Sequence, residues 1–121
     1  MAVGDFSERS AAGEALGKLG AAAVPTVTPL LHDSSADVRL TAAKALRRIG
    51  PDARAAVPGL VALLTDRDLA IRSTAIDALE AIGPGARGAI GSLEGLAQRD
   101  PTLRLAVERA LRAIRVPAPR R

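Results

Sequence analysis

The chain has 121 residues, enough for one domain with a sizeable core; 48% are hydrophobic but only 1% are aromatic, so Ala, Leu, Val and Ile must form that core. There is no cysteine, which excludes disulfides and thiol chemistry, and the net charge of +4 is concentrated at one end, since residues 99–121 carry +5 and residues 1–98 carry −1. We expect a cytoplasmic protein, because the N-terminus lacks a signal-peptide pattern and no apolar run reaches the roughly 18 residues of a membrane helix. Fifteen Arg against two Lys is typical of a GC-rich bacterial genome.

After an N-terminal extension at residues 1–6, one helical pattern recurs four times. Aligned on their last residue, the copies are ERSAAGEALGKLG (8–20), VRLTAAKALRRIG (38–50), IRSTAIDALEAIG (71–83) and LRLAVERALRAIR (103–115). Each has Arg in the second position and Ala-Leu in the eighth and ninth. In the second copy the apolar residues fall at i, i+4, i+7, i+8 and i+11, one stripe of an amphipathic helix, and Gly50-Pro51 predicts its end. We predict one helix, called helix B, in each copy.

A looser segment precedes every helix B after the first. These segments are AAAVPTVTPLLHD (21–33), ARAAVPGLVALLTD (53–66) and ARGAIGSLEGLAQRD (86–100). Each is predicted to form a shorter helix, called helix A. Pro58 suits a first helical turn, where its missing N–H is not needed, whereas Pro29 predicts a kink or a shortened helix.

A pair of helices of this size cannot bury both of its apolar faces alone, and stacking on copies of itself produces a continuous core. The pattern V-R-x-x-A-A-x-A-L-x-x-I-G-P, followed by A-V-P-x-L-x-x-L-L-x-D, resembles the short HEAT-like repeat of the phycocyanobilin-lyase type over about residues 7–115. The resemblance implies an all-α, armadillo-like α-solenoid: a right-handed α-α superhelix of about seven helices. Its expected divisions are a half repeat (7–20), three repeats (21–50, 51–83 and 84–115) and a basic C-terminal tail (116–121).

The Arg at the second position of each helix B has two explanations. A row of arginines can bind phosphates, or it can form a ladder with aspartates of its own or a neighbouring repeat. Aspartates recur before these arginines, as Asp33, Asp66 and Asp100 illustrate. Because the two residue types recur together, we favour the ladder.

The exposed ridge of helix B is the candidate binding surface, and the resemblance implies that it lines the concave side of a solenoid. Its residues differ between copies while the framework stays constant, although an ordinary solvated face also varies in this way. Asp77 and Glu80 interrupt the basic residues, which favours a mixed-charge protein partner over a long polyanion. The predicted function is a non-enzymatic scaffold for protein–protein interaction. The candidate contact residues are Lys18, Lys44, Arg47, Arg48, Glu80, Arg109 and Arg112.

No catalytic, metal or cofactor site is predicted. His32 is the only histidine and has no partner at metal-ligand spacing, and the chain has no nucleophile–base set and no phosphate-binding loop. Two alternatives stay open: a nucleic-acid-binding module acting through the C-terminal Arg cluster, and a non-catalytic subunit or chaperone related to bilin lyases, which the resemblance implies. Neither end shows an obviously polar capping helix, so end-to-end self-association is a further expectation.

Overall fold

The computed structural model describes residues 20–117, and all regular secondary structure within this range is helical. Residues 20–27 are α-helical and continue into a short 3-10 helix. The α-helices that follow are α2 (Ala36–Ile49), α3 (Val57–Leu63), α4 (Leu69–Ile82), α5 (Ile90–Arg99) and α6 (Arg104–Ile114). The 3-10 helices are η1 (Thr28–His32), η2 (Gly50–Ala56), η3 (Gly83–Ala89) and η4 (Pro101–Leu103).

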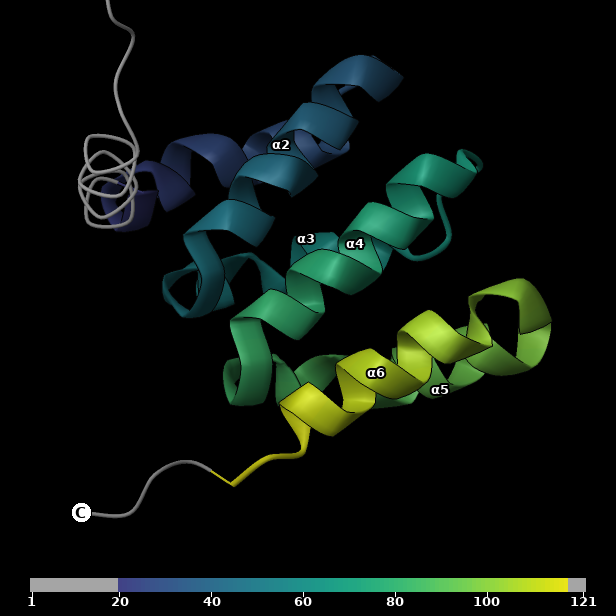
Figure 1. Cartoon of the computed structure of the whole chain (residues 1–121). Coiled ribbons are helices and arrows are strands. Elements are labelled where there is room, and N and C mark those ends of the chain that lie inside the picture. Colours follow the sequence, from purple (N-terminus) through teal and green to yellow (C-terminus); the bar gives the residue numbers. More distant parts are fainter. Residues whose placement is uncertain (1–19, 118–121) are drawn as a thin grey trace, which may run out of the picture.

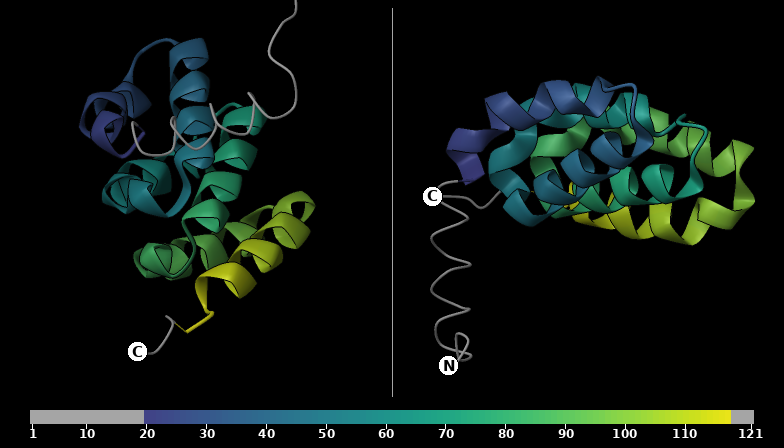
Figure 2. Two further views of the ribbon diagram at one scale, coloured as in Figure 1. Left: turned by 60° about the vertical axis from the view of Figure 1, so that its left-hand side comes forward. Right: turned by 90° about the horizontal axis from the view of Figure 1, so that it is seen from above.

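The helices form two layers that are stacked along one direction (Figure 1). The predicted B helices α2, α4 and α6 lie side by side and run the same way, with α4 packed between the other two. The predicted A helices form the second layer, where α3 packs on η1 and on η3 (Figure 2). This is a solenoid-like arrangement, in which each helix pair contacts mainly its neighbours.

The expected number of about seven helices is not reached in the described residues. Within residues 20–117, only α2, α4, α5 and α6 are α-helices of ten residues or more. Helix α3 is shorter because the first part of its A segment is the 3-10 helix η2, and η3 likewise precedes α5. The first predicted B segment, at residues 8–20, lies almost wholly outside the described residues.

The prolines of the A segments act as predicted. Pro58 lies in the first turn of α3. At Pro29, the α-helix of residues 20–27 gives way to the tighter helix η1, which has that proline in its first turn. A proline removes an N–H donor, so it is tolerated in a first turn and shortens a helix that would otherwise pass through it.

The core lies between the two layers and is aliphatic. The leucines at the ninth position of helix B are buried: Leu46 and Leu79 are 0% exposed and Leu111 is 8% exposed. Small residues let neighbouring A segments approach closely, since a Cβ added at Gly59 of α3 would lie 2.7 Å from Cδ1 of Leu31 in η1. The burial of these leucines confirms the apolar stripe predicted for helix B.

Local chemistry fixes both ends of helix B. Ser35 and Asp68 cap α2 and α4 by accepting hydrogen bonds from backbone N–H groups of the first turn. Gly50 and Gly83 end these helices at φ values of 77° and 74°, where only glycine is unstrained. Arg115 takes the equivalent place after α6 with an ordinary right-handed backbone (φ −81°). The last helix therefore leaves the stack without the turn that leads the other two into a new helix pair.

Candidate functional site

The arginines at the second position of helix B form a ladder that joins successive repeats. The Nε of Arg39 donates to Oδ2 of Asp66 in the next repeat at 2.8 Å, while Nη1 donates to the carbonyl oxygen of Asp33 in its own loop at 2.8 Å. Arg72 repeats both contacts: Nη1 donates to the carbonyl oxygen of Asp66 at 2.7 Å, and Nη2 lies 3.8 Å from Oδ2 of Asp100. The predicted ladder is confirmed for Arg39 and Arg72, each of which uses both its own loop and that of the next repeat.

Asp66 is the loop aspartate whose carboxylate joins the first rung of the ladder to its own loop. Its side chain is only 8% exposed, and its two carboxylate oxygens accept from the backbone N of Asp68 and from Arg39. Burial by itself would raise the pKa of Asp66, but these hydrogen bonds and the arginine charge outweigh it and hold the pKa below its ordinary value. The carboxylate is thus a structural anion, and Arg39 is its counterion.

The second exposed feature is the face made by α2, α4 and α6. Lys44, Arg47 and Arg48 are exposed on α2, and Arg109 and Arg112 are exposed on α6. Glu80 is partly buried on α4, between the two basic helices. The structure therefore brings these six candidate residues together on one face, whereas Lys18 lies outside the described residues.

An ion-pair cluster ties the middle of this face together. Asp77 of α4 lies 3.9 Å from Nη1 of Arg47 on α2 and 3.7 Å from Nη2 of Arg109 on α6. The Nε of Arg109 also donates to Oε1 of Glu80 at 3.2 Å. Burial raises the pKa of Asp77 above its ordinary value and Glu80 adds to this effect, while the two arginines oppose it. We call the surface of Lys44, Arg47, Arg48, Asp77, Glu80, Arg109 and Arg112 the α2–α4–α6 face.

Asp77 is the residue that the list of candidate contacts missed. It occupies the same position of helix B as Lys44 and Arg109, the seventh. This shared position in the repeat could have identified Asp77 as part of the candidate surface, because it places all three side chains on one line across the stack. The pairing itself joins residues about 30 positions apart, so the chain had to be folded before the partners could be assigned.

The C-terminal end of the stack differs from its interior at two positions. Glu108 stands where α2 and α4 have the fully buried Ala43 and Ile76, and Arg115 stands where they have the buried Gly50 and Gly83. Both Glu108 and Arg115 are exposed. We call this outer side of α6 the cap of the described stack. Because Leu111 and Val116 also line it, the expectation that neither end has an obviously polar capping helix stays a prediction.

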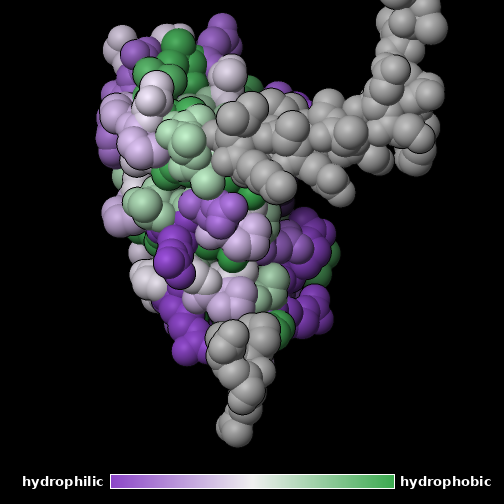
Figure 3. Space-filling model, turned by 90° about the vertical axis from the view of Figure 1, so that its left-hand side faces the viewer, coloured by the Kyte–Doolittle hydropathy of each residue, from purple (hydrophilic) through white to green (hydrophobic). Residues whose placement is uncertain are grey.

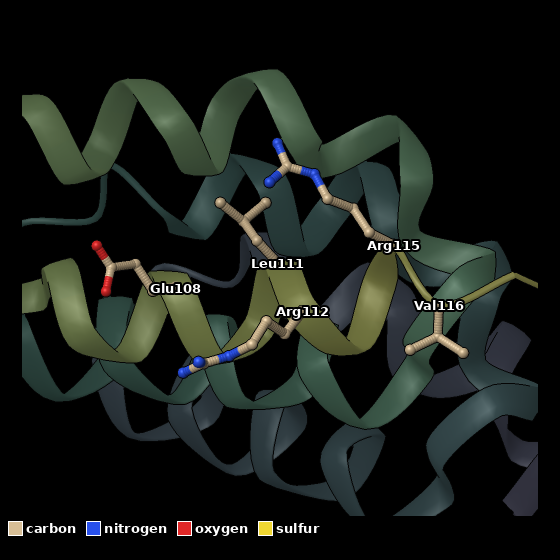
Figure 4. A pocket seen from close by; sticks show the side chains of 5 residues that line it. All are labelled: Glu108, Leu111, Arg112, Arg115 and Val116. Carbon is tan, nitrogen blue, oxygen red and sulfur yellow. The ribbon is translucent and has the colours of Figure 1, made fainter.

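A shallow groove of about 460 Å³ lies on this cap and is lined by Glu108, Leu111, Arg112, Arg115 and Val116. Figure 4 shows the charged side chains projecting from α6 along the groove, with Val116 just beyond the helix. Arg115 is held by an ion pair with Glu94 of α5. Burying Glu108 and Arg112 under another helix would remove them from water without built-in partners, which makes end-to-end stacking at this end unfavourable.

The opposite end of the stack is apolar. A groove of about 280 Å³ is lined by Val27, Leu30, Asp37, Val38, Thr41, Ala42 and Ala45. In the next repeat Ile71, Ala75 and Ala78 occupy the positions of Val38, Ala42 and Ala45, and all three are 0% exposed beneath α2. The groove residues are thus equivalent to residues that a neighbouring helix buries in the next repeat, so the groove could accommodate one more helix.

No group of three or more His, Cys, Asp or Glu side chains within residues 20–117 is placed to hold a metal ion. Every helix in the same range is too short or too polar to span a bilayer. The edge where α2, α4 and α6 end carries hydrophilic residues interspersed with hydrophobic ones (Figure 3).

The stacked helix pairs, their shared register and the ladder between them define a repeat protein of the all-helical, solenoid-like class. Residues 4–56 match the family of HEAT repeats, and the helix pairs after residue 56 repeat the same architecture. The match and the all-helical stack together support a HEAT-like repeat protein. The match is to HEAT repeats in general, so the narrower phycocyanobilin-lyase type stays a prediction. None of the curated proteins matches the chain.

Proposed function

We propose that the protein is a non-enzymatic scaffold that docks another protein on its α2–α4–α6 face. HEAT repeats commonly serve as interaction scaffolds. The observation that supports the proposal is the contrast within helix B. The Arg at the second position and the Ala-Leu at the eighth and ninth are the same in every copy, while exposed positions change from basic on α2 to acidic on α4 and basic again on α6. A framework that repeats and a surface that varies are what a binding array needs.

The finer features of the fold belong to the same proposal. We take the stack to be a right-handed superhelix with the α2–α4–α6 face on its concave side. The proposed divisions are those given above, with residues 7–20 as a leading half repeat. A cytoplasmic location is also part of the proposal, since it places the face where protein partners are available.

The nucleic-acid alternative has less support. Of the Arg cluster at the C-terminal end, Arg109 is paired with Glu80 and Asp77, and Arg115 is paired with Glu94. Phosphates would have to compete with these carboxylates for both arginines. A mobility-shift assay at rising salt tests this alternative, since phosphate contacts weaken binding with a log–log slope of about −0.9 per contact. No shift at low salt removes it.

The scaffold itself is tested by affinity capture of partners from a cell extract. The variant Lys44→Glu/Arg47→Glu/Arg48→Glu reverses the charge of α2 on the proposed face. Its control, Arg54→Glu/Arg67→Glu/Arg87→Glu, makes the same change in net charge at exposed residues outside that face. We expect the first variant to lose partners that the control keeps. If both variants capture the wild-type set, this face is not the docking surface.

A further inference from the structure

The uncompensated charge of the α2–α4–α6 face lies at its two sides and not in its middle. Five cations and two acids stand on the face. Arg47 and Arg109 already contact Asp77, and Arg109 also contacts Glu80. Lys44, Arg48 and Arg112 form no ion pair with any other residue that the structure describes, and all three are exposed. Among residues 20–117, the positive charge without an ion-pair partner on this face therefore sits on α2 and on α6, and α4 separates the two groups.

Helix packing sets the distance between these groups. Axes of packed helices lie about 8–10 Å apart, so α2 and α6 are separated by roughly 16–20 Å across α4. An extended chain covers about 3.3–3.6 Å per residue, so five or six residues span that gap. A ligand matched to this face carries negative charge at two places about six residues apart, with neutral residues between them.

From this arrangement we infer that the partner contributes a split acidic segment: an extended stretch of protein with Asp or Glu at both ends and an uncharged centre that crosses α4. The inference rests on the proposed scaffold function and specifies the partner's chemistry. Acidic ends pair with Lys44 and Arg48 on one side and Arg112 on the other. The neutral centre passes over Asp77 and Glu80, which repel a negative charge at that place.

The same arrangement disfavours a nucleic acid as the occupant. A duplex carries about one charge per 1.7 Å of its axis, so its phosphates cannot skip the middle of the face, where both arginines are already paired with acids. Single strands are usually gripped by aromatic stacking, and Phe6 is the only aromatic residue of the chain. The spacing of charges in a polypeptide varies with its sequence, whereas in a nucleic acid the phosphate backbone fixes it.

Asp77 and Glu80 have a specific role in this scheme. They hold Arg47 and Arg109 and thereby act as internal competitors of an acidic ligand. Replacing them with Asn and Gln frees both arginines and makes the face uniformly basic. The Asp77→Asn/Glu80→Gln variant should then bind acidic ligands more tightly and accept continuous charge in the centre, so its selectivity for a split segment should decline.

The test is fluorescence anisotropy at low ionic strength with a labelled peptide that has a Glu-Glu pair at each end and about six Gly, Ser and Asn residues between them. A second peptide has Gln in place of Glu, a third has its four Glu residues adjacent at the centre, and a single-stranded oligonucleotide represents nucleic acid. We expect the full-length chain to bind the split peptide best. The variant Lys44→Gln/Arg48→Gln should weaken that binding about five- to tenfold, as for the loss of two partly exposed ion pairs.

The matched control is Arg54→Gln/Arg87→Gln, which removes two charges from exposed positions on the other layer. Equal weakening by the two double variants would show attraction to net charge alone and overturn the inference. The inference also fails if the split peptide binds no better than the adjacent-charge peptide or the oligonucleotide, or if Asp77→Asn/Glu80→Gln does not tighten binding. Should the capture experiment succeed while these peptide tests fail, the scaffold stands and the acidic nature of its partner is refuted.

Discussion

Replacing Arg39 with Ala removes the best-formed rung of the ladder between repeats. The side chain makes four hydrogen bonds, two to the carboxylate of Asp66 and two to carbonyl oxygens of the loop that precedes α2. It is 17% exposed and its partner 8% exposed, so solvent screens the pair only in part. A hydrogen bond to a charged group contributes about 1.5–3 kcal/mol, and exposed ion pairs contribute less than 1 kcal/mol. We therefore expect Arg39→Ala to lower the free energy of unfolding by about 2 kcal/mol.

Arg104 is an internal control for this prediction. It holds the same position in α6, but it forms no ion pair with the residues that the structure describes. It also lies at the start of a helix, where a positive charge is unfavourable. Arg104→Ala should change the free energy of unfolding by no more than about 0.5 kcal/mol in either direction.

Thermal unfolding followed by circular dichroism measures both variants. About 4 °C per kcal/mol applies to a chain of this length, so Arg39→Ala should lower Tm by about 8 °C and Arg104→Ala by about 2 °C at most. The difference between wild type and Arg39→Ala should also depend on pH. Because the folded pKa of Asp66 is lowered, its contribution is present above the ordinary Asp value of about 3.9 and is lost as pH falls below it. Equal losses for the two variants, or a difference that does not shrink at all as pH falls below the ordinary Asp value, would refute the Arg39–Asp66 pair as a source of stability.

Three further changes test other parts of the fold. Gly83→Ala should lower the free energy of unfolding by about 1–3 kcal/mol through backbone strain alone, because φ is 74° and nothing lies within 4 Å of an added Cβ. The control in the same denaturation series is Gly88→Ala, which also has open space around an added Cβ but has no positive φ. Leu79→Ala should lower the free energy of unfolding by about 3 kcal/mol because the side chain is wholly buried. Leu105→Ala should lower it by less than about 0.5 kcal/mol because that side chain is 78% exposed. Similar urea midpoints for the two variants would contradict the assigned core. Asp77 has a raised folded pKa, caused first by burial, so its contribution to stability is greatest at acid pH and is lost as pH rises through that pKa. Asp77→Asn should accordingly be no less stable than wild type at pH 7 and relatively less stable at pH 4, and a large loss at pH 7 would show that the two arginine contacts dominate.

The sequence predicted helix B well because its signals are local. The periodic apolar stripe places Leu46 and Leu79 in the core, and Gly50 and Gly83 mark where the helices end. Helices α2 and α4 begin two residues earlier than the repeated pattern, since the caps are at Ser35 and Asp68. That difference follows from the loop chemistry, which the aligned pattern did not include.

The candidate site was predictable only in part. The ladder was expected because Arg and Asp recur together, but its register depended on how the repeats stack. The contacts of Asp77 with Arg47 and Arg109 depend on the separation of three helices, which no local pattern encodes. For the same reason the difference at Glu108 of α6 was missed: this residue is unremarkable in an amphipathic helix until one knows that its equivalents, Ala43 and Ile76, are buried.

The charged outer side of α6 also decides where this array can be lengthened by design. A unit copied from residues 51–83 and inserted after Gly83 would meet an unchanged neighbour on each side, and the original α6 would still finish the molecule. The same unit joined after Arg115 would have to place a new helix over Glu108 and Arg112. An engineer who wants a longer version of this protein should therefore add modules in the interior and leave its final helix as the terminus.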